Sequence, residues 1–200
     1  MCGVVAWIKG GRRSVPGICK LLEESAIRGV HSFGFYGPGG TSKHHRLAEA
    51  VKQMPMAPFI FHNRYSTSGD WDDHNNNQPI ISGSVGMAFN GTLDMRTKEE
   101  MEAAHGVKMR TYNDGELALL AYLKGGDRGL MDFIEETGGS FAGVFLEPGR
   151  LFAYRNTKRP LWVVDEGSLA VIASTQDILS RAGFNGAEEL EAGEIHSWTL

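Results

Sequence analysis

The chain has 200 residues, a length typical of one domain, and its 42% hydrophobic and 22% charged residues exclude a disordered or low-complexity protein. Its 20 basic and 24 acidic residues give a net charge of -4, which excludes the strongly basic surface of a dedicated nucleic-acid binder. No apolar run reaches the ~20 residues of a membrane span and no secretory signal is evident, so we expect one domain over residues 1–200 in the cytoplasm.

The periodicity of apolar residues predicts the elements of the first half of the chain. Residues 3–8 form an apolar, partly β-branched run, which predicts a buried strand. Apolar side chains at helical spacing predict an amphipathic helix over 15–28. Further strands are expected over 32–36, 59–64 and 85–89.

Helices are expected in the middle of the chain. Thr97 followed by Glu100 predicts a capping box, and a longer helix through Leu123 is expected to begin at Asn113 or Asp114. Another helix is expected over 129–136, and a short one over 176–182. Strands are expected again over 140–147, 151–155, 161–164, 169–173 and 194–199. Because strands dominate both ends without βαβ alternation, the pattern predicts an α+β protein with largely antiparallel sheets.

Cys2 is the first candidate for chemistry. Initiator methionine is normally removed when the second residue is small, which would make Cys2 the N-terminal residue. Its α-amine, with a pKa of about 7.7–8.0, could then accept the thiol proton. One residue would supply both nucleophile and general base. Gly3 is expected to leave room for a substrate near the backbone, whereas Cys19 is expected to act as a small apolar residue.

Three further segments offer parts for acyl transfer, each with a structural alternative. Asn90-Gly91 could place an amide and a backbone N–H beside the nucleophile, but the dipeptide locally favours a hairpin turn. Arg64 could bind a carboxylate through two parallel hydrogen bonds or form a structural salt bridge. Asp114 could hold an ammonium group or cap the following helix.

The histidines show no spacing typical of a metal site. There is no HExxH and no paired Cys/His pattern, so we expect no metal and interpret these residues as turn or surface histidines. They are His44, His45, His62, His74 and His105.

Taken in order, the segments that follow Cys2 resemble the glutaminase domain of class II glutamine amidotransferases, a branch of the N-terminal nucleophile (Ntn) hydrolases. The motifs that carry this resemblance span almost the whole chain. They are Cys2-Gly3-Val4-Val5, Arg28-Gly29 with Ser32 and Gly34, Arg64-Tyr65-Ser66-Thr67 with Gly69, Asn77-Gln78-Pro79, Asn90-Gly91-Thr92-Leu93, Asp114-Gly115-Glu116, Gly139-Ser140-Phe141-Ala142, Arg159-Pro160-Leu161, Ala173-Ser174 and Gly193-Glu194-Ile195.

The resemblance implies a four-layer αββα sandwich of two mainly antiparallel sheets. It also implies that Cys2 is the nucleophile, and that the Asn90 side chain and the Gly91 backbone N–H form the oxyanion hole. Arg28 would help to organise the catalytic end. The family forms a loop after Arg64 that closes over bound glutamine, and Gly69 fits such a lid.

The resemblance further implies L-glutamine as substrate, with Arg64 and Thr67 holding its α-carboxylate and Asp114 its α-ammonium. The implied reaction is hydrolysis to L-glutamate and ammonia through a thioester on Cys2, without a cofactor. Family members commonly continue into a domain that consumes the ammonia. Because this chain ends at Leu200, we expect a separate ammonia-accepting synthase or transferase subunit. The alternatives are hydrolysis of another γ-glutamyl or small amide, and a catalytically inactive binding module.

Three positions depart from the family pattern. His31 and Asn156 stand where an aspartate is usual, and Phe89 stands where a histidine is common. These changes affect the surroundings of the expected site and leave its proposed catalytic and substrate-binding residues in place.

Overall fold

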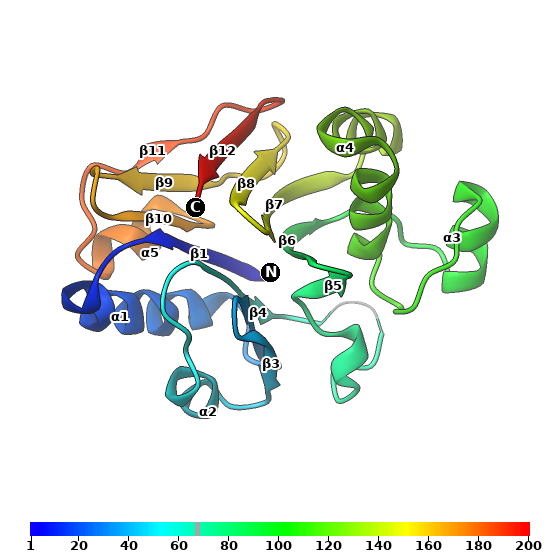
Figure 1. Cartoon of the computed structure of the whole chain (residues 1–200). Coiled ribbons are helices and arrows are strands. Elements are labelled where there is room, and N and C mark those ends of the chain that lie inside the picture. The colour runs from blue at the N-terminus through cyan, green and yellow to red at the C-terminus, as the bar shows by residue number, and fades with distance from the viewer. Residues whose placement is uncertain (67–68) are drawn as a thin grey trace.

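Two antiparallel β-sheets stack face to face between outer helices in the computed structural model, which describes residues 1–66 and 69–200 (Figure 1). The larger sheet has the strand order β11 (Glu188–Glu189), β9 (Trp162–Asp165), β10 (Ala170–Ala173), β1 (Gly3–Lys9), β4 (Phe59–Arg64), β2 (Ser32–Gly37) and β3 (Gly40–His44). The smaller sheet has the order β12 (Ile195–Thr199), β8 (Arg150–Arg155), β7 (Ser140–Glu147), β6 (Val85–Thr92) and β5 (Ile80–Ser82).

Helices cover the outer face of each sheet. Figure 1 shows α1 (Val15–Ser25) and α2 (Leu47–Lys52) on one side of the strands and α4 (Gly115–Thr137) on the other. Short α5 (Gln176–Arg181) packs beside α1, and α3 (Lys98–His105) precedes α4. The remaining turns are the 3₁₀ segments η1 (Arg12–Ser14), η2 (Ala26–Arg28) and η3 (His74–Asn76).

The side chains of β1 show how the layers form. Val4 and Ala6 point between the two sheets, whereas Val5 and Trp7 point outward to the helices α1 and α5. Because successive side chains of a strand alternate between its two faces, a strand that is apolar throughout must be covered on both faces. The α+β sandwich of two antiparallel sheets is therefore confirmed.

The predicted strands are confirmed, and the helices differ in detail. The helix expected over 15–28 is α1 followed by the 3₁₀ turn η2. The two helices expected before and after residues 124–128 are the two halves of α4, which are separated by a kink where Gly126 is non-helical, at φ 62°. The capping box of Thr97 and Glu100 is present at the start of α3. The sequence did not predict α2 or the short strands β3, β5 and β11.

Strand direction brings distant segments to one end of the sandwich. In the antiparallel register, Gly3 lies beside Asn63, and Ser32 lies beside Arg64. The start of β1, the end of β4 and the start of β2 therefore lie together. Within the described residues, no helix is long and apolar enough to cross a bilayer.

Candidate active site

Cys2 lies immediately before β1, at this end of the sandwich. Its thiol contacts the backbone carbonyl of Tyr65 at 3.6 Å, at the end of the adjacent strand β4. Burial raises the pKa of the Cys2 thiol, the terminal ammonium and Arg64 oppose the increase, and the negative charge of Asp114 adds to it. The nucleophile candidate is therefore a protonated thiol at neutral pH, and the charges of the terminal ammonium, Arg64 and Asp114 all act on it.

Arg28 holds the backbone of Cys2 in place. η2 turns the chain after α1, and the Nε of Arg28 donates to the Cys2 carbonyl at 2.9 Å. Arg28 therefore contacts the backbone of Cys2 and not its sulfur.

Gly3 packs against other side chains and leaves no room for a substrate. A Cβ on Gly3 would lie 2.2 Å from Oδ1 of Asn63 and 2.6 Å from Oγ of Ser25. The amide of Asn63 accepts from the Ser25 hydroxyl at 2.6 Å and donates to the Ser25 carbonyl at 2.9 Å. The expectation that Gly3 makes space for a substrate was therefore wrong. The space beside Gly3 is filled by Asn63 and Ser25, whose hydrogen bonds join α1 to β4.

Arg64 is the last residue of β4 and is buried, with 3% of its surface exposed. Its guanidinium donates to the Asn76 carbonyl at 3.0 Å and to Oδ1 of Asn77 at 2.6 Å. Nη2 also donates to the Gly69 carbonyl at 3.4 Å. These three acceptors are neutral oxygens, and they fix the orientation of the guanidinium. Thr67, the other expected carboxylate-binding residue, lies outside the described residues.

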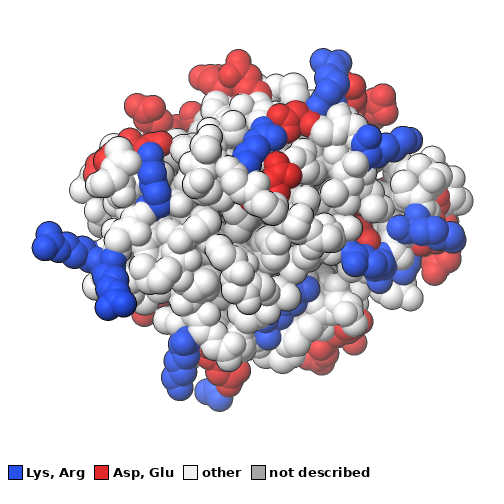
Figure 2. Space-filling view, viewed as in Figure 1, with Lys and Arg blue, Asp and Glu red and all other residues white. Residues whose placement is uncertain are grey.

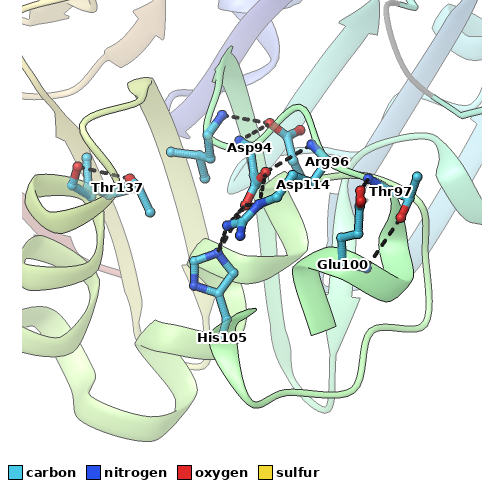
Figure 3. Close-up of polar contacts among 9 residues, drawn as sticks. Asp94, Arg96, Thr97, Glu100, His105, Asp114 and Thr137 are labelled. Atoms are coloured by element: carbon cyan, nitrogen blue, oxygen red, sulfur yellow. Dashed lines mark hydrogen bonds and ion pairs between the residues drawn. The ribbon is translucent and has the colours of Figure 1, made fainter. Parts of the chain in front are cut away.

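Asp114 precedes α4, and its side chain does not cap that helix. Its Oδ2 accepts from the backbone N–H of Leu93 at 2.6 Å and of Asp94 at 3.2 Å. Figure 3 shows Asp114 beside Asp94. The cap contact at this end comes from Asn113, whose Oδ1 accepts from the Gly115 N–H at 3.0 Å. Burial raises the pKa of Asp114, while the backbone N–H donors oppose the increase. The carboxylate therefore ties the start of α4 to the chain that leaves β6.

Asn90 and Gly91 lie inside β6, so the hairpin interpretation was wrong. Asn90 pairs with Ala142 and Gly91 with Phe141 in the ladder between β6 and β7. A Cβ on Gly91 would lie 1.9 Å from the Ser140 carbonyl oxygen, so only glycine fits there. Asn90 is 3% exposed, and its Nδ2 has no hydrogen-bond partner among the described residues. A buried amide donor without a partner is costly, so this Nδ2 differs from most buried side-chain amides.

No protein-family model matches the chain, and no curated protein matches it in sequence. A solved structure of the glutamine phosphoribosylpyrophosphate amidotransferase from B. subtilis, complexed with ADP and GMP, aligns with a TM-score of 0.70 at 20% identity. That alignment covers 100% of this chain and 47% of the other. The chain has the fold of the class II glutamine amidotransferases.

Two further structures share this fold. A structure described as the allosteric regulatory enzyme of purine biosynthesis gives a TM-score of 0.71 at 21% identity, covering 99% of this chain and 47% of that chain. A structure of a glutamine aminotransferase class-II domain protein from Silicibacter pomeroyi gives a TM-score of 0.65 at 13% identity. That alignment covers 99% of this chain and 95% of the other. This chain therefore spans about half the length of the first two proteins and almost all of the third.

Within this class II amidotransferase fold, a charged cluster holds the segment that binds Asp114. The carboxylate of Asp94 accepts from Arg96 Nη2 at 2.6 Å and lies 3.1 Å from Nε2 of His105. Figure 3 shows both side chains directed at this carboxylate. The guanidinium of Arg96 lowers the pKa of Asp94. Sequence reasoning missed this cluster because residues 94, 96 and 105 come together only when α3 folds back on the loop.

Two departures from the family pattern have local structural reasons. The Asn156 side chain accepts from the Phe141 N–H at 3.1 Å and donates to the Gly139 carbonyl at 2.8 Å, and an ionised aspartate could not donate the second bond. The ring of Phe89 packs on Phe141 at 5.3 Å and on the α4 residue Gly115, where a Cβ would lie 2.0 Å from the ring.

The histidines do not all lie in turns or at the surface. His62 is fully buried in the middle of β4, and this burial lowers its pKa to about 3, which makes it a neutral imidazole. Both of its ring nitrogens lack a hydrogen-bond partner among the described residues. The surface interpretation of His62 was therefore wrong. In the part of the chain that the structure describes, no group of three or more His, Cys, Asp or Glu side chains could hold a metal ion.

His31 organises the segment that follows Arg64. Its ring lies between those of Tyr65, at 5.1 Å, and Trp71, at 5.3 Å, and is nearly parallel to both. Its Nδ1 accepts from the Ser66 N–H at 2.9 Å. An aspartate could accept this hydrogen bond, but only a ring can also stack between the two aromatic side chains.

We expect the Ser66 amide to report this contact. His31→Phe keeps a ring and removes the acceptor. Exchange of the Ser66 amide hydrogen should therefore accelerate about fivefold, because one ordinary hydrogen bond contributes about 1 kcal/mol. His31→Asn offers a side-chain acceptor without the ring and should accelerate it less. Residue-resolved hydrogen exchange measures this, with the Leu93 amide, bound to Asp114, as an unchanged control. Equal exchange of Ser66 in the parent and His31→Phe would contradict the assignment.

Proposed function

We propose that this chain, as one domain, is the glutaminase domain of a class II glutamine amidotransferase, acting in the cytoplasm. It would hydrolyse L-glutamine to L-glutamate and ammonia, with Cys2 as nucleophile after removal of Met1. One observation carries the proposal: the half-buried thiol of Cys2 lies 3.6 Å from the carbonyl of Tyr65, the residue after Arg64, and the charges of Arg64 and Asp114 both act on its pKa. A cation and an anion beside one nucleophile complement the carboxylate and the ammonium of a free α-amino acid.

The proposed mechanism begins at the N-terminus. The neutral α-amine of Cys2 takes the thiol proton as the sulfur attacks the γ-carbonyl carbon of glutamine. The α-amine would act as the base because burial raises the pKa of the thiol. The resulting ammonium then gives its proton to the leaving nitrogen, so ammonia departs and a γ-glutamyl thioester remains. Water, deprotonated by the same amine, cleaves this thioester to give glutamate and restores the thiol.

Asn90 and Gly91 would stabilise the oxyanion formed in both steps. The Nδ2 of Asn90 is buried and without a partner in the described chain, so it can donate to a new acceptor without breaking a bond of the fold. The Gly91 N–H would be the second donor. Such prearranged donors act on the transition state because negative charge on the carbonyl oxygen grows there.

Arg64 and Thr67 would bind the substrate carboxylate, and Asp114 its ammonium. Burial of Asp114 strengthens its attraction for a cation, because few waters compete with it. The ammonia would pass to a separate synthase or transferase subunit, and the reaction would need no cofactor. On the face seen in Figure 2, charged side chains of both signs are scattered around the periphery, which supports a protein or small-molecule partner over nucleic acid.

We expect ammonia release from glutamine by protein whose intact mass confirms loss of Met1. Asp114→Asn should raise the KM for glutamine about 10- to 100-fold, because it removes a charge-assisted contact with the ammonium. Glutaramate lacks the α-ammonium, so its KM should change little in the same variant. The asparagine can still accept the backbone hydrogen bonds of Leu93 and Asp94, which preserves the local structure.

The outcomes separate the alternatives. An unchanged KM for glutamine in folded Asp114→Asn would contradict the assignment of the ammonium site. Hydrolysis of other γ-glutamyl amides without hydrolysis of glutamine would favour the alternative that the protein is a hydrolase of another γ-glutamyl or small amide. Binding of glutamine without turnover would favour the inactive module.

A further inference from the structure

Two arginines from distant parts of the chain converge beside the nucleophile. Nη2 of Arg28 lies 3.9 Å from the sulfur of Met1, and Nη1 of Arg159 lies 3.4 Å from the same atom. Arg28 comes from η2 on one sheet, whereas Arg159 follows β8 of the other sheet. The two guanidinium groups therefore meet across the end of the sandwich, at the Met1 side chain, which is 63% exposed.

The Nε of each guanidinium is held by the fold, and one Nη group of each is directed at the sulfur of Met1. Nε of Arg28 donates to the Cys2 carbonyl at 2.9 Å, and Nε of Arg159 contacts the Ser140 hydroxyl at 3.2 Å. Such anchoring fixes the direction of a planar guanidinium and lowers the entropy lost when it binds a ligand. A thioether sulfur is a weak acceptor for two such donors.

No carboxylate neutralises this pair among the residues that the structure describes. Arginines 46, 96, 110, 128, 150, 155 and 181 form ion pairs elsewhere. Asp177 is the acidic residue whose charge acts on Arg28, but its carboxylate contacts Arg181 at 3.5 Å and Thr175 at 2.5 Å. Burial lowers the pKa of Arg28, and the positive charge of Arg159 adds to this effect. Two converging cations with no anion between them are a binding arrangement for an anion.

We propose that Arg28 and Arg159 form a subsite for the carboxylate or phosphate group of a small molecule, which occupies the position of the Met1 side chain once Met1 is removed. The inference rests on the proposed function for that removal. Two oxygens of one oxyanion can each accept a hydrogen bond of about 2.7–2.9 Å from one guanidinium. The exposure of Met1 gives a ligand access from solvent.

The test uses inorganic phosphate and acetate as probes, titrated by calorimetry into protein from which methionine aminopeptidase has removed Met1. We expect phosphate to bind more tightly than acetate, because a dianion gains more from two cations. Arg159→Gln should weaken phosphate binding roughly 10- to 100-fold, the value of one charge-assisted hydrogen bond. Arg159→Lys keeps the charge but loses the planar guanidinium, so its affinity for phosphate should lie between those of the parent and Arg159→Gln.

Two controls isolate the subsite. Arg12→Gln removes the same charge at the opposite end of β1, where Arg12 is exposed, and should leave phosphate binding unchanged. Protein that retains Met1 should bind phosphate as weakly as Arg159→Gln does. Parental binding in folded Arg159→Gln and Arg159→Lys, or equal binding with and without Met1, would overturn the subsite.

The ammonia assay distinguishes this inference from the proposed function. Glutamine turnover by protein that does not bind phosphate overturns only the anion subsite. Phosphate binding that depends on Arg159, in protein that does not hydrolyse glutamine, supports the subsite and overturns only the glutaminase.

Discussion

Cys2→Ser is expected to abolish glutamine hydrolysis, lowering kcat by at least about a thousandfold while the protein stays folded. A serine hydroxyl is far less acidic than a thiol, so the α-amine of residue 2 cannot deprotonate it effectively. Burial already raises the pKa of the Cys2 thiol, and the same environment would penalise an alkoxide more strongly. Steady-state ammonia release, with a melting curve for each protein, measures the effect.

Cys19 provides the matched control for this prediction. It is the other cysteine of the chain, half-buried on α1, and Cys19→Ser should leave kcat within about twofold of the parent. A glutamine analogue with an electrophile at the γ position should add its mass only to the peptide that contains Cys2. Labelling of Cys19, or turnover by folded Cys2→Ser, would exclude the proposed nucleophile.

The fold was largely predictable because its central strands are apolar on both faces. The run of residues 3–8 and the run of 59–64 become β1 and β4, the adjacent strands that bring Cys2 and Arg64 to one end. The missed strands β3 and β5 are short and lie at sheet edges, where fewer side chains are buried. Edge strands carry a weaker apolar signal, and sequence periodicity alone does not detect them.

The site shows where local sequence rules fail. Asn90-Gly91 has the strongest short signal for a hairpin, yet pairing with Ala142 and Phe141 of β7 keeps it extended. The long-range ladder determines the conformation there, and it is not visible in a window of a few residues. Arg159 and Met1 likewise meet only through the stacking of two sheets. Contacts of this kind cannot be predicted from a short window of sequence, because they depend on how distant strands pair and stack.

His62 illustrates a second limit. A histidine between Phe61 and Asn63, within a strand that is only partly apolar, can face either solvent or the space between sheets. The alternation of β4 places Ile60 between the sheets, and residue 62 must share that face. This signal was present in the sequence, but it identifies a buried face only once a second sheet is known to cover it.

Asn90→Asp is expected to lower kcat by about 10²–10³ with little change in KM, as for other single oxyanion-hole donors. Aspartate has nearly the same shape, so the pairing of β6 with β7 should persist. Its carboxylate cannot donate a hydrogen bond when ionised, and it opposes the negative charge that develops on the substrate oxygen. Glycine is a poorer test here, because in the middle of a strand it also weakens the sheet.

The unpartnered Nδ2 makes this prediction discriminating. Because Nδ2 of Asn90 has no hydrogen-bond partner among the described residues, replacing it removes no hydrogen bond from the fold. Replacing a purely structural asparagine would destabilise the protein, because its hydrogen bonds within the fold would be lost. Replacing Asn90 is instead expected to lower activity. Asn185→Asp, an exposed site with the same change in charge, should leave kcat and the melting temperature unchanged. Near-parental kcat in folded Asn90→Asp would mean that the oxyanion is stabilised elsewhere, and the buried amide would then need another ligand as its acceptor.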